Sequence, residues 1–363
     1  MALKGNKGEW SELYVLFKLL GEQKIHAGDG MLNKLEVYYP ILKILRDELL
    51  RHMEYSYDKD IVIVTENGNE VSQVNISEFM TQSEHLFKVM KDGGNGNGAF
   101  ELPSLNDFLK KIHCDKIKAK SLDKSDIHII IHDYHTGMQP NLGFSIKSDA
   151  GGSPTLLNSS AATSFLYKVC GNTNIMDNDM VESINGIEGN RKIQDRVNAI
   201  YNKNYLLKFD SIESDVFYNN LRMIDSLLPE IMAWLIIDCY KNRNMNIKCA
   251  VERITAINPF NFNLSEGHDF YKYKMKCLMI ASALGMLPAK PWNGQYDATG
   301  GYIVVKEDGD IICFHIYDRN QLEDYLFNNT KFETPSSSRH EFSRIENING
   351  ELFFKLNLQI RFN

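Results

Sequence analysis

One aspartate and one lysine-bearing segment are spaced so that they can meet at the edge of a sheet. Asp126 opens an apolar run that ends at Ile131, and the segment 142–148 carries Ser145 and Lys147. If both segments are strands paired as a hairpin, side-chain alternation places Ser145 and Lys147 on one polar face near Asp126, while their neighbours face a core. This grouping suits phosphodiester hydrolysis, because a carboxylate holds a hard cation such as Mg²⁺ and a lysine orients or activates the attacking water.

A single carboxylate is too few for a metal site, so a second acidic residue is expected from another element. Residues 8–20 predict a helix whose apolar face carries Trp10, Leu13, Phe17 and Leu20. Glu12 lies at the edge of that face, where a helix packed on the sheet would direct it at Asp126, and Glu9 is the fallback. The alternative is that Glu12 is a solvated helix residue with an i,i+4 partner, and that the strand pattern occurs by chance.

The hydrophobic pattern along the chain predicts both helices and strands, so the expected fold class is α/β (α+β). The first half predicts helices at 8–20, 31–54, 77–91, 104–114 and 155–169, and strands at 60–65, 70–76, 126–133 and 142–148. The second half predicts helices to about residue 287, a core helix within 221–240, and strands at 301–306, 311–317 and 352–362. The catalytic core is expected in 1–170 and a recognition region in 171–363, with a soft boundary.

Composition restricts the class of protein without identifying a substrate. The chain has 363 residues and a formal net charge of −7, which does not favour a protein that coats nucleic acid nonspecifically. A local basic surface is enough for a nuclease, and residues 108–124 offer one.

The chain also lacks the sequence marks of a secreted or membrane protein. Its apolar runs are too short to span a bilayer, and its first residues contain no apolar segment typical of a signal peptide. Six scattered cysteines form no CxxC pair, which predicts free thiols in a reducing cytosol. We therefore expect a cytoplasmic protein that does not interact with membranes.

Polar residues near the end of the chain are candidates for contacts with DNA. Asn357, Gln359 and Arg361 share one face of the last predicted strand, opposite the apolar residues Leu356, Leu358, Ile360 and Phe362. Arginine pairs with guanine, and Asn or Gln pairs with other base edges. The turn Ser336–Ser337–Ser338–Arg339 is a candidate for holding a base or a phosphate. The plain alternative is a half-exposed strand and a polar loop.

Three residues follow the lysine-bearing strand and open the helix predicted at 155–169. Asn158, Ser159 and Ser160 would stand near the N-terminus of that helix, which suits anions such as backbone phosphates.

Several segments together resemble the PD-(D/E)XK nuclease superfamily and, more narrowly, the HpaII family of type II restriction endonucleases. These segments are KGNKGEWSELY (4–14), GFSIKS (143–148), PTLLNSS (154–160), TPSSSRH (334–340) and LNLQIRF (356–362). They span nearly the whole chain. The resemblance implies a restriction-endonuclease-like core, with a mixed central sheet flanked by helices and a helical and β-hairpin elaboration for DNA recognition.

The same resemblance implies roles for individual residues. Asp126 matches the aspartate of the superfamily, Lys147 its lysine and Glu12 its helix glutamate. Ser145 stands where an acidic residue is usual, so the missing charge must come from elsewhere. Glu12 is favoured for this, and Asp133 and Asp149 are the alternatives.

The resemblance further implies an activity and its partners. The expected enzyme cuts double-stranded DNA at CCGG after the first C, requires Mg²⁺, and acts as a homodimer in the bacterial cytoplasm. A cognate DNA methyltransferase would act on the same site without needing to bind this protein. A monomer that nicks each strand in turn is the alternative to the dimer.

Two other functions remain open at this stage. A structure-specific or repair nuclease of the same superfamily would keep Glu12, Asp126 and Lys147 but would need no base-reading strand. A catalytically inactive DNA-binding protein is the other alternative, and it is motivated by Ser145 in the acidic position.

Overall fold

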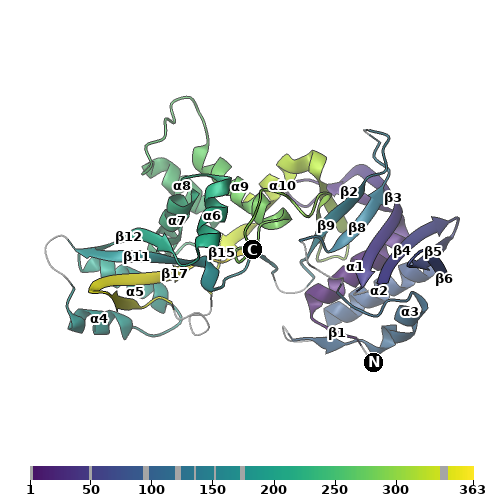
Figure 1. The fold of residues 1–363 in the computed structure, drawn as a ribbon, viewed down its shortest axis with the longest axis horizontal. Coiled ribbons are helices and arrows are strands. Elements are labelled where there is room, and N and C mark those ends of the chain that lie inside the picture. Colours follow the sequence, from purple (N-terminus) through teal and green to yellow (C-terminus); the bar gives the residue numbers. More distant parts are fainter. Residues whose placement is uncertain are drawn as a thin grey trace. The chain divides into compact units, whose positions relative to one another are not determined.

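The computed structural model describes residues 3–48, 51–92, 98–118, 124–134, 136–150, 153–171, 176–335 and 342–363 (Figure 1). The chain divides into two compact units, each built from separate stretches of sequence. The first unit comprises Met1–Pro154, Ala283–Gly285 and Tyr296–Tyr325. The second comprises Thr155–Ser282, Met286–Gln295 and Leu326–Asn363. Both units combine helices with sheet, so the α/β class expected from the sequence is confirmed.

The first unit is built on a mixed sheet, which has nine strands within the described residues, in the order β2-β14-β13-β9-β8-β3-β4-β5-β6. Strand β13 runs parallel to β9 and β14 runs parallel to β2, while the other neighbours are antiparallel. The strands are β2 (Lys24–Gly28), β3 (Lys34–Glu48), β4 (Arg51–Asp58), β5 (Ile61–Glu66), β6 (Asn69–Asn75), β8 (Ile127–Ile131), β9 (Asn141–Ser148), β13 (Gly301–Val305) and β14 (Ile311–His315).

Strand β3 changes partners along its length and closes part of this sheet into a ring. Its first half pairs with β2, and its second half pairs with β8 and β4. Among the described strands, β2, β14, β13, β9, β8 and β3 therefore form a closed circuit of pairings. Gly301 at the start of β13 has φ +116°, and a Cβ there would lie 1.9 Å from the Phe314 carbonyl oxygen, so only glycine fits.

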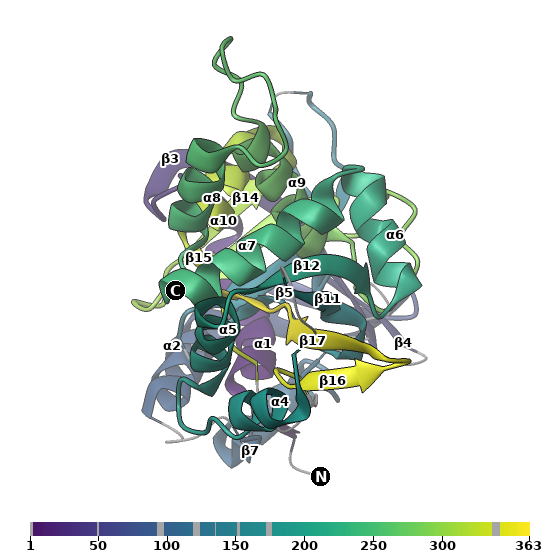
Figure 2. The same cartoon turned by 90° about the vertical axis from the view of Figure 1, so that its left-hand side faces the viewer.

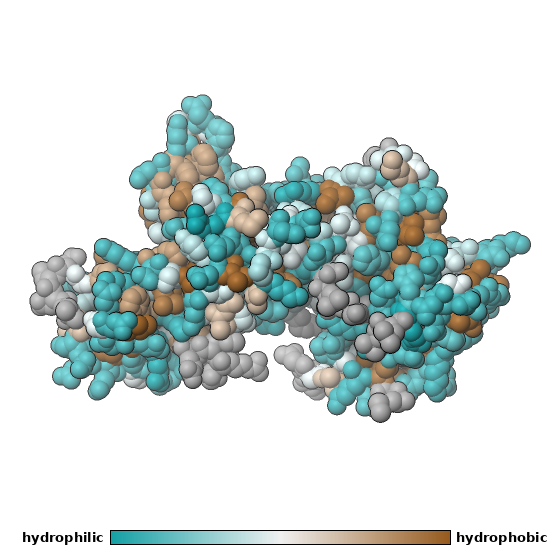
Figure 3. Space-filling model, viewed as in Figure 1, coloured by the Kyte–Doolittle hydropathy of each residue, from teal (hydrophilic) through white to brown (hydrophobic). Residues whose placement is uncertain are grey.

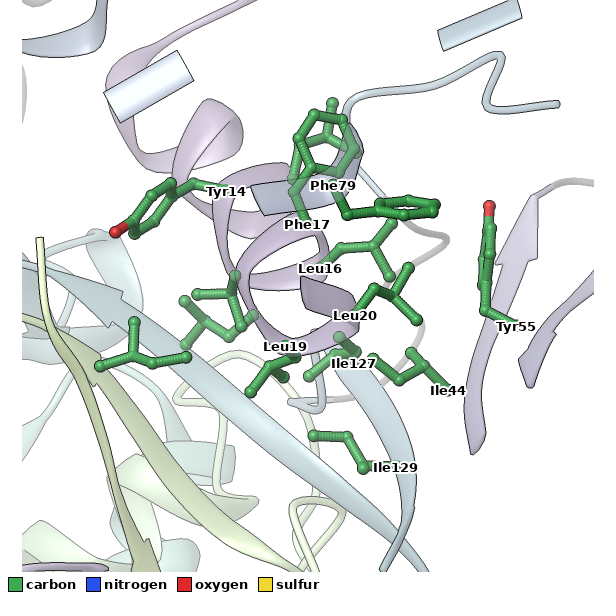
Figure 4. Close-up of a cluster of buried hydrophobic side chains, with 14 of the residues drawn as sticks. Tyr14, Leu16, Phe17, Leu19, Leu20, Ile44, Tyr55, Phe79, Ile127 and Ile129 are labelled. Carbon is green, nitrogen blue, oxygen red and sulfur yellow. The ribbon is translucent and has the colours of Figure 1, made fainter. Parts of the chain in front are cut away.

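Helix α1 (Lys7–Glu22) packs on this sheet and carries one of the predicted acidic residues. Leu19 and Leu20 point toward Ile44 of β3 and toward Ile127 and Ile129 of β8 (Figure 4). The other side of the helix is covered by α2 (Ile76–Asp92), which explains why α1 is buried along most of its length. A smaller helix, α3 (Asn106–Lys111), follows a 3-10 turn at Pro103–Leu105.

The second unit contains smaller sheets and most of the later helices (Figure 2). Its described strands form the orders β12-β11-β17-β16 and β10-β18-β15, and helices α5, α6 and α7 pack against β12. The strands are β10 (Thr155–Leu157), β11 (Ser164–Gly171), β12 (Tyr205–Ile212), β15 (Thr330–Phe332), β16 (Ile345–Ile348), β17 (Glu351–Asn357) and β18 (Ile360–Phe362). The helices are α4 (Asn178–Asn185), α5 (Lys192–Asn202), α6 (Asp215–Ile224), α7 (Leu228–Asn242), α8 (Ile247–Ile257) and α9 (Phe270–Leu284).

The helix predicted at 31–54 is wrong, because β3 and β4 occupy this stretch. Ile41, Ile44 and Leu45 have helical spacing, which explains the prediction. Pro40 has no backbone N–H and so cannot donate the hydrogen bond that a residue inside a helix makes. In the strand, its carbonyl accepts a hydrogen bond from the His132 N–H (2.9 Å). The strand also contains a bulge between Ile41 and Lys43, which shifts the apolar pattern away from strict alternation.

The helix predicted at 155–169 is also wrong, since β10 and β11 form there with a three-residue 3-10 turn, Ala161–Thr163, between them. Phe165 and Tyr167 alternate into the core, and the Ser and Asn residues before them favour a loop. Asn158 and Ser159 therefore do not stand at the N-terminus of a long helix, and the argument for anion binding by that helix fails.

The final predicted strand is divided into β17 and β18. Leu356, Leu358, Ile360 and Phe362 are all buried, as the alternation predicts, but Asn357 on the other face is buried as well. These strands belong to sheets of the second unit and do not join the nine-stranded sheet. The apolar stretch 221–240 likewise divides into α6 and α7, and α7 is a core helix.

The face of the molecule drawn in Figure 3 is largely polar. In the view of Figure 3, apolar residues are scattered among hydrophilic ones. Within the described parts of the chain, no helix is both long enough and apolar enough to cross a membrane.

Candidate active site

Asp126 is held against β9 by three hydrogen bonds at the point where β8 begins. Its N–H donates to the Phe144 carbonyl (2.8 Å), and its Oδ2 accepts from the Ile146 N–H (2.7 Å) and from the Ser145 hydroxyl (3.3 Å). The predicted pairing of these strands is confirmed, with Ile127 opposite Phe144. Ser145 therefore orients Asp126, whereas an acidic side chain at position 145 would repel it.

The two faces of β9 are both covered. Phe144 and Ile146 pack in the core beneath α1, as the alternation predicts. Ser145 lies on the opposite face beside Tyr302 of β13 and is only 2% exposed. The predicted position at the edge of a sheet is wrong, because β9 lies between β8 and β13. Lys147, two residues further along the strand, is half-buried.

The covering of this second face comes partly from a late helix. Phe314 of β14 stacks on Tyr325 of α10 (Arg319–Asn328), with ring centroids 4.9 Å apart. The face of β9 that carries Ser145 is therefore covered at Ser145 and becomes more exposed at Lys147.

Glu12 is a buried carboxyl group close enough to Asp126 to feel its charge. The side chain is 9% exposed, and its Oε2 has no hydrogen-bond partner. Burial, and next the negative charge of Asp126, raise the pKa of Glu12 from 4.5 to about 8, while the charges of Lys118 and Arg46 oppose the rise. A buried carboxylate oxygen without a donor is costly unless a cation or a proton occupies it.

The alternative acidic residues have other partners. Glu9 completes a capping box with Asn6, accepting from the Asn6 N–H at 2.8 Å and donating its own N–H to the Asn6 side chain at 3.0 Å. Asp133 lies beyond the other end of β8 and accepts from Tyr317 (2.7 Å) and Thr136 (2.6 Å). The pKa of Asp149 is raised by burial and by Glu307. Glu9 and Asp133 are thus engaged in other hydrogen bonds, and the charge interaction with Asp126 favours Glu12 as the candidate partner.

A second lysine lies in this region. Burial, and next the positive charge of Lys147, lower the pKa of Lys124 from 10.5 to about 8, against the opposing effects of Asp126 and Asp297. Sequence reasoning included Lys124 only within the basic stretch 108–124, and its position two residues before Asp126 was the signal that could have singled it out.

The carboxylates fit a divalent cation that is bound mainly through water and substrate. Within the described ranges, no group of three His, Cys, Asp or Glu residues is arranged to hold a metal ion. Glu12 and Asp126 make a pair of hard oxygen donors, and Oε2 of Glu12 is free to accept a cation. Mg²⁺ is commonly held by one or two carboxylates together with water and substrate phosphate, so the pair is sufficient for such a site.

The predicted DNA-contacting residues are found in different settings. Ser338 and Arg339 lie outside the described residues. Asn357 is only 2% exposed, and its amide bonds the Ser160 carbonyl (2.7 Å), the Ser164 hydroxyl (3.0 Å) and the Thr163 hydroxyl (3.0 Å). It therefore fixes the turn between β10 and β11.

Four of the remaining candidates lie nearer the surface of the second unit. Gln359 and Arg361 are half-buried at the end of the chain, and Arg361 stands opposite Thr155 in the register of β18 with β10. Asn158 is exposed and Ser159 is half-buried in the loop after β10.

The buried Glu12 of α1, the half-buried Asp126 just before β8 and Lys147 of β9 are residue types that suit metal-assisted phosphodiester hydrolysis. The chain belongs to the HpaII restriction endonuclease family, whose model matches residues 6–362. It is 48% identical over 362 residues to the type II restriction enzyme HpaII of Haemophilus parainfluenzae, covering 99% of this chain and 98% of that relative. No solved structure matches it. The protein is accordingly a site-specific endonuclease that acts on double-stranded DNA, and enzymes of this type generally need divalent metal ions.

Proposed function

We propose that this endonuclease cuts both strands of CCGG after the first C, with Mg²⁺ as its metal ion and a PD-(D/E)XK-type core as its catalytic framework. The observation that carries the catalytic part is the buried carboxyl group of Glu12 within the electrostatic reach of Asp126, which is hydrogen-bonded to the strand of Lys147. The target sequence is supported by the resemblance to the HpaII family along nearly the whole chain.

Glu12 and Asp126 would hold the metal ion. When bound, such an ion polarises the phosphate and promotes formation of the attacking hydroxide. The raised pKa of Glu12 means that its carboxyl group carries a proton at neutral pH until a cation replaces that proton.

The other residues of the site orient Asp126 and the reacting groups. The Ile146 N–H and the Ser145 hydroxyl fix one oxygen of Asp126. Lys147, from the same strand, orients the attacking water and stabilises negative charge that develops on the phosphate.

Recognition of the bases is assigned to residues near the end of the chain. Gln359 and Arg361, with Arg339, are proposed to read base edges, since Arg pairs with guanine and Gln with other polar edges. Ser338, Asn158 and Ser159 are proposed to contact backbone phosphates. Asn357 supports this surface by holding the turn that follows Asn158 and Ser159.

The test is digestion of a sequenced plasmid with Mg²⁺, followed by mapping of the ends. Discrete fragments with every end at CCGG, after the first C, are expected. Discrete fragments with ends at another sequence would overturn the proposed target and keep the enzyme class. Cutting confined to branched or damaged substrates would favour a repair nuclease, and no cutting with either Mg²⁺ or Mn²⁺ would favour a DNA-binding protein with an inactive site.

A further inference from the structure

The small sheet β10-β18-β15 of the second unit has one buried face and one polar face. Phe332 of β15 and Ile360 and Phe362 of β18 form the buried face, since each is 5% exposed or less. Lys331 and Arg361 alternate with them along the two strands and are half-buried. Because side chains alternate between the faces of a sheet, Lys331 and Arg361 project from the polar face.

Lys331 and Arg361 stand directly opposite each other on this face. The register of β15 with β18 pairs the two residues, and a backbone hydrogen bond from the Asn363 N–H to the Asn329 carbonyl (2.9 Å) continues the same register. Residues that are directly opposite in an antiparallel pair have Cβ atoms about 5 Å apart. Two cationic side chains therefore leave the sheet side by side.

The strand that carries Lys331 is also held on the side away from β18. Asn246 forms an isolated antiparallel bridge with Lys331, and the Phe332 N–H donates to the Met245 carbonyl (2.9 Å). The backbone of Lys331 is therefore fixed by pairings on both sides.

The charge of Lys331 is not compensated within the protein. Among the described residues, no side chain forms an ion pair or a hydrogen bond with its ammonium group, and this includes Glu333, two residues further along the chain. Like charges directly opposite each other destabilise a pair of strands, so the position of Lys331 beside Arg361 has a cost in the free protein. A bound anion would supply the missing negative charge.

We propose that Lys331 binds a backbone phosphate of the target DNA, next to the base pair that Arg361 reads. This inference rests on the proposed function, in which Arg361 contacts a guanine. The ammonium group of a lysine is a compact point charge that suits a phosphate, whereas the planar guanidinium of Arg361 matches the two acceptors of guanine. A phosphate contact from the neighbouring strand would fix the position of Arg361 in the groove without reading the sequence itself.

The test measures binding of the wild type and Lys331→Gln to duplex DNA in Ca²⁺ at several salt concentrations. Loss of one phosphate contact should reduce the slope of log K against log salt by about one unit. Lys331→Arg should keep the wild-type slope, since it keeps the charge. A wild-type slope in Lys331→Gln would overturn the inference.

The same measurement separates a phosphate contact from a base contact. The affinity of Lys331→Gln should fall by the same factor for CCGG and for duplexes that differ from it at one position, because a phosphate carries no sequence information. A fall confined to CCGG would show that Lys331 reads a base, and it would overturn the phosphate contact.

Lys355→Gln is the matched control from another strand of the second unit. The side chain of Lys355 in β17 is 21% exposed and forms an ion pair with Glu213 (3.3 Å), so its replacement should leave the salt dependence of binding unchanged. An equal fall of the slope in Lys355→Gln would show that the effect follows total charge, which would also contradict a specific contact by Lys331.

Thermal unfolding without DNA separates a binding role of Lys331 from a structural one. Lys331→Gln removes one of two opposed cations, so its Tm at low salt should equal or exceed that of the wild type, and salt should reduce the difference. If the Tm falls instead, Lys331→Met decides, because it keeps the apolar stem without the charge. A wild-type slope in Lys331→Met would then overturn the inference.

Single methylphosphonate substitutions along the duplex locate the contact, since each replaces one charged phosphate by a neutral group. At one phosphate beside the recognised bases, the substitution should weaken binding by the wild type and not by Lys331→Gln. Equal losses for the two proteins at every position would overturn the assignment to a phosphate.

Failure of the inference can be distinguished from failure of the proposed function. If Arg361→Ala loses discrimination while Lys331→Gln behaves as the wild type, only the role of Lys331 is wrong. If Lys331→Gln shows the reduced slope but the mapped ends lie at another sequence, the phosphate contact stands and the proposed target is wrong.

Discussion

A proton and a metal ion compete for the buried carboxyl group of Glu12. Its pKa is raised to about 8 in the folded protein, so the folded state binds a proton that the unfolded state releases above pH 4.5. The associated stability is present at low pH and is lost as pH rises through about 8. A cation that replaces the proton would offset the cost of burying the charged carboxylate at high pH.

Glu12→Gln should therefore make the metal-free protein less sensitive to pH. With EDTA present, the wild type should lose stability between pH 6 and pH 9, on the order of a few kcal/mol, and the variant should lose much less. Ca²⁺ should raise the Tm of the wild type at pH 8 and leave that of the variant unchanged. Both effects can be followed by thermal unfolding, and equal pH profiles for the two proteins would contradict the assignment.

Glu9→Gln is the control for this measurement. Glu9 belongs to the capping box and its side chain accepts from Asn6, so its replacement should change stability without removing the pH dependence or the response to Ca²⁺.

Lys147→Ala should abolish cleavage while leaving specific binding to DNA in Ca²⁺. The reason is that Lys147 is half-buried near the end of β9 and is proposed to act on the reacting groups, whereas Phe144 and Ile146 of the same strand pack in the core. Circular dichroism checks the fold of the variant. A variant that does not fold would instead indicate a structural lysine.

Arg361→Ala should weaken discrimination between CCGG and sequences that differ from it at one position. A bidentate contact to guanine contributes about 1–3 kcal/mol, so the ratio of cleavage rates should fall by a factor of about 5 to 150. Lys331→Ala is a suitable control, because Lys331 stands opposite Arg361 in the register of β15 with β18. An unchanged ratio in Arg361→Ala would remove this residue from the reading surface.

The strand pairing at the candidate site was predictable because it joins segments that are close in the sequence. Asp126 and Lys147 are joined by a short hairpin, and period-two alternation is enough to place Ser145 and Lys147 together. The contact of Lys124 with Asp297 was not predictable, since it joins residues separated by 173 positions. The orienting role of Ser145 also depends on a distance between side chains that no sequence pattern contains.

Among the secondary-structure elements, clear periodicity and clear turns were predicted correctly. The hairpin β5–β6 has the turn residues Asn67 and Gly68, both with positive φ, and α2 has a strong amphipathic pattern. The region of β3 and β4 was misassigned because its spacing fits a helix as well. In that region the hydrogen-bond partners β2 and β8, which lie elsewhere in the sequence, decide the structure.

Asn6→Ala should destabilise the protein through the start of α1. Asn6 caps the helix reciprocally with Glu9, and loss of such a cap typically costs about 1 kcal/mol. Urea unfolding should show this loss with an unchanged m-value. Asn6→Ser keeps a capping oxygen and should lose less, and equal losses for the two variants would argue against the cap.

For the whole molecule, a symmetric target favours a symmetric enzyme. A two-fold dimer presents the same surface to each half of a palindrome. We therefore expect two copies of Asp126→Asn on one CCGG duplex in Ca²⁺, measured by analytical ultracentrifugation. A stable complex of one copy per duplex would point to successive nicking of the two strands.

The circuit of strands around β9 has a consequence for when the enzyme becomes active in the cell. Strand β9 lies between β8 and β13, and β13 begins only at Gly301. During synthesis, the ribosome releases Glu12, Asp126 and Lys147 long before this flanking strand exists. In a nascent or truncated chain that ends before β13, Lys147 would lie on an open strand edge, without the turn that holds Lys124. We therefore expect cleavage of DNA to begin only late in translation, when most of the chain has been made.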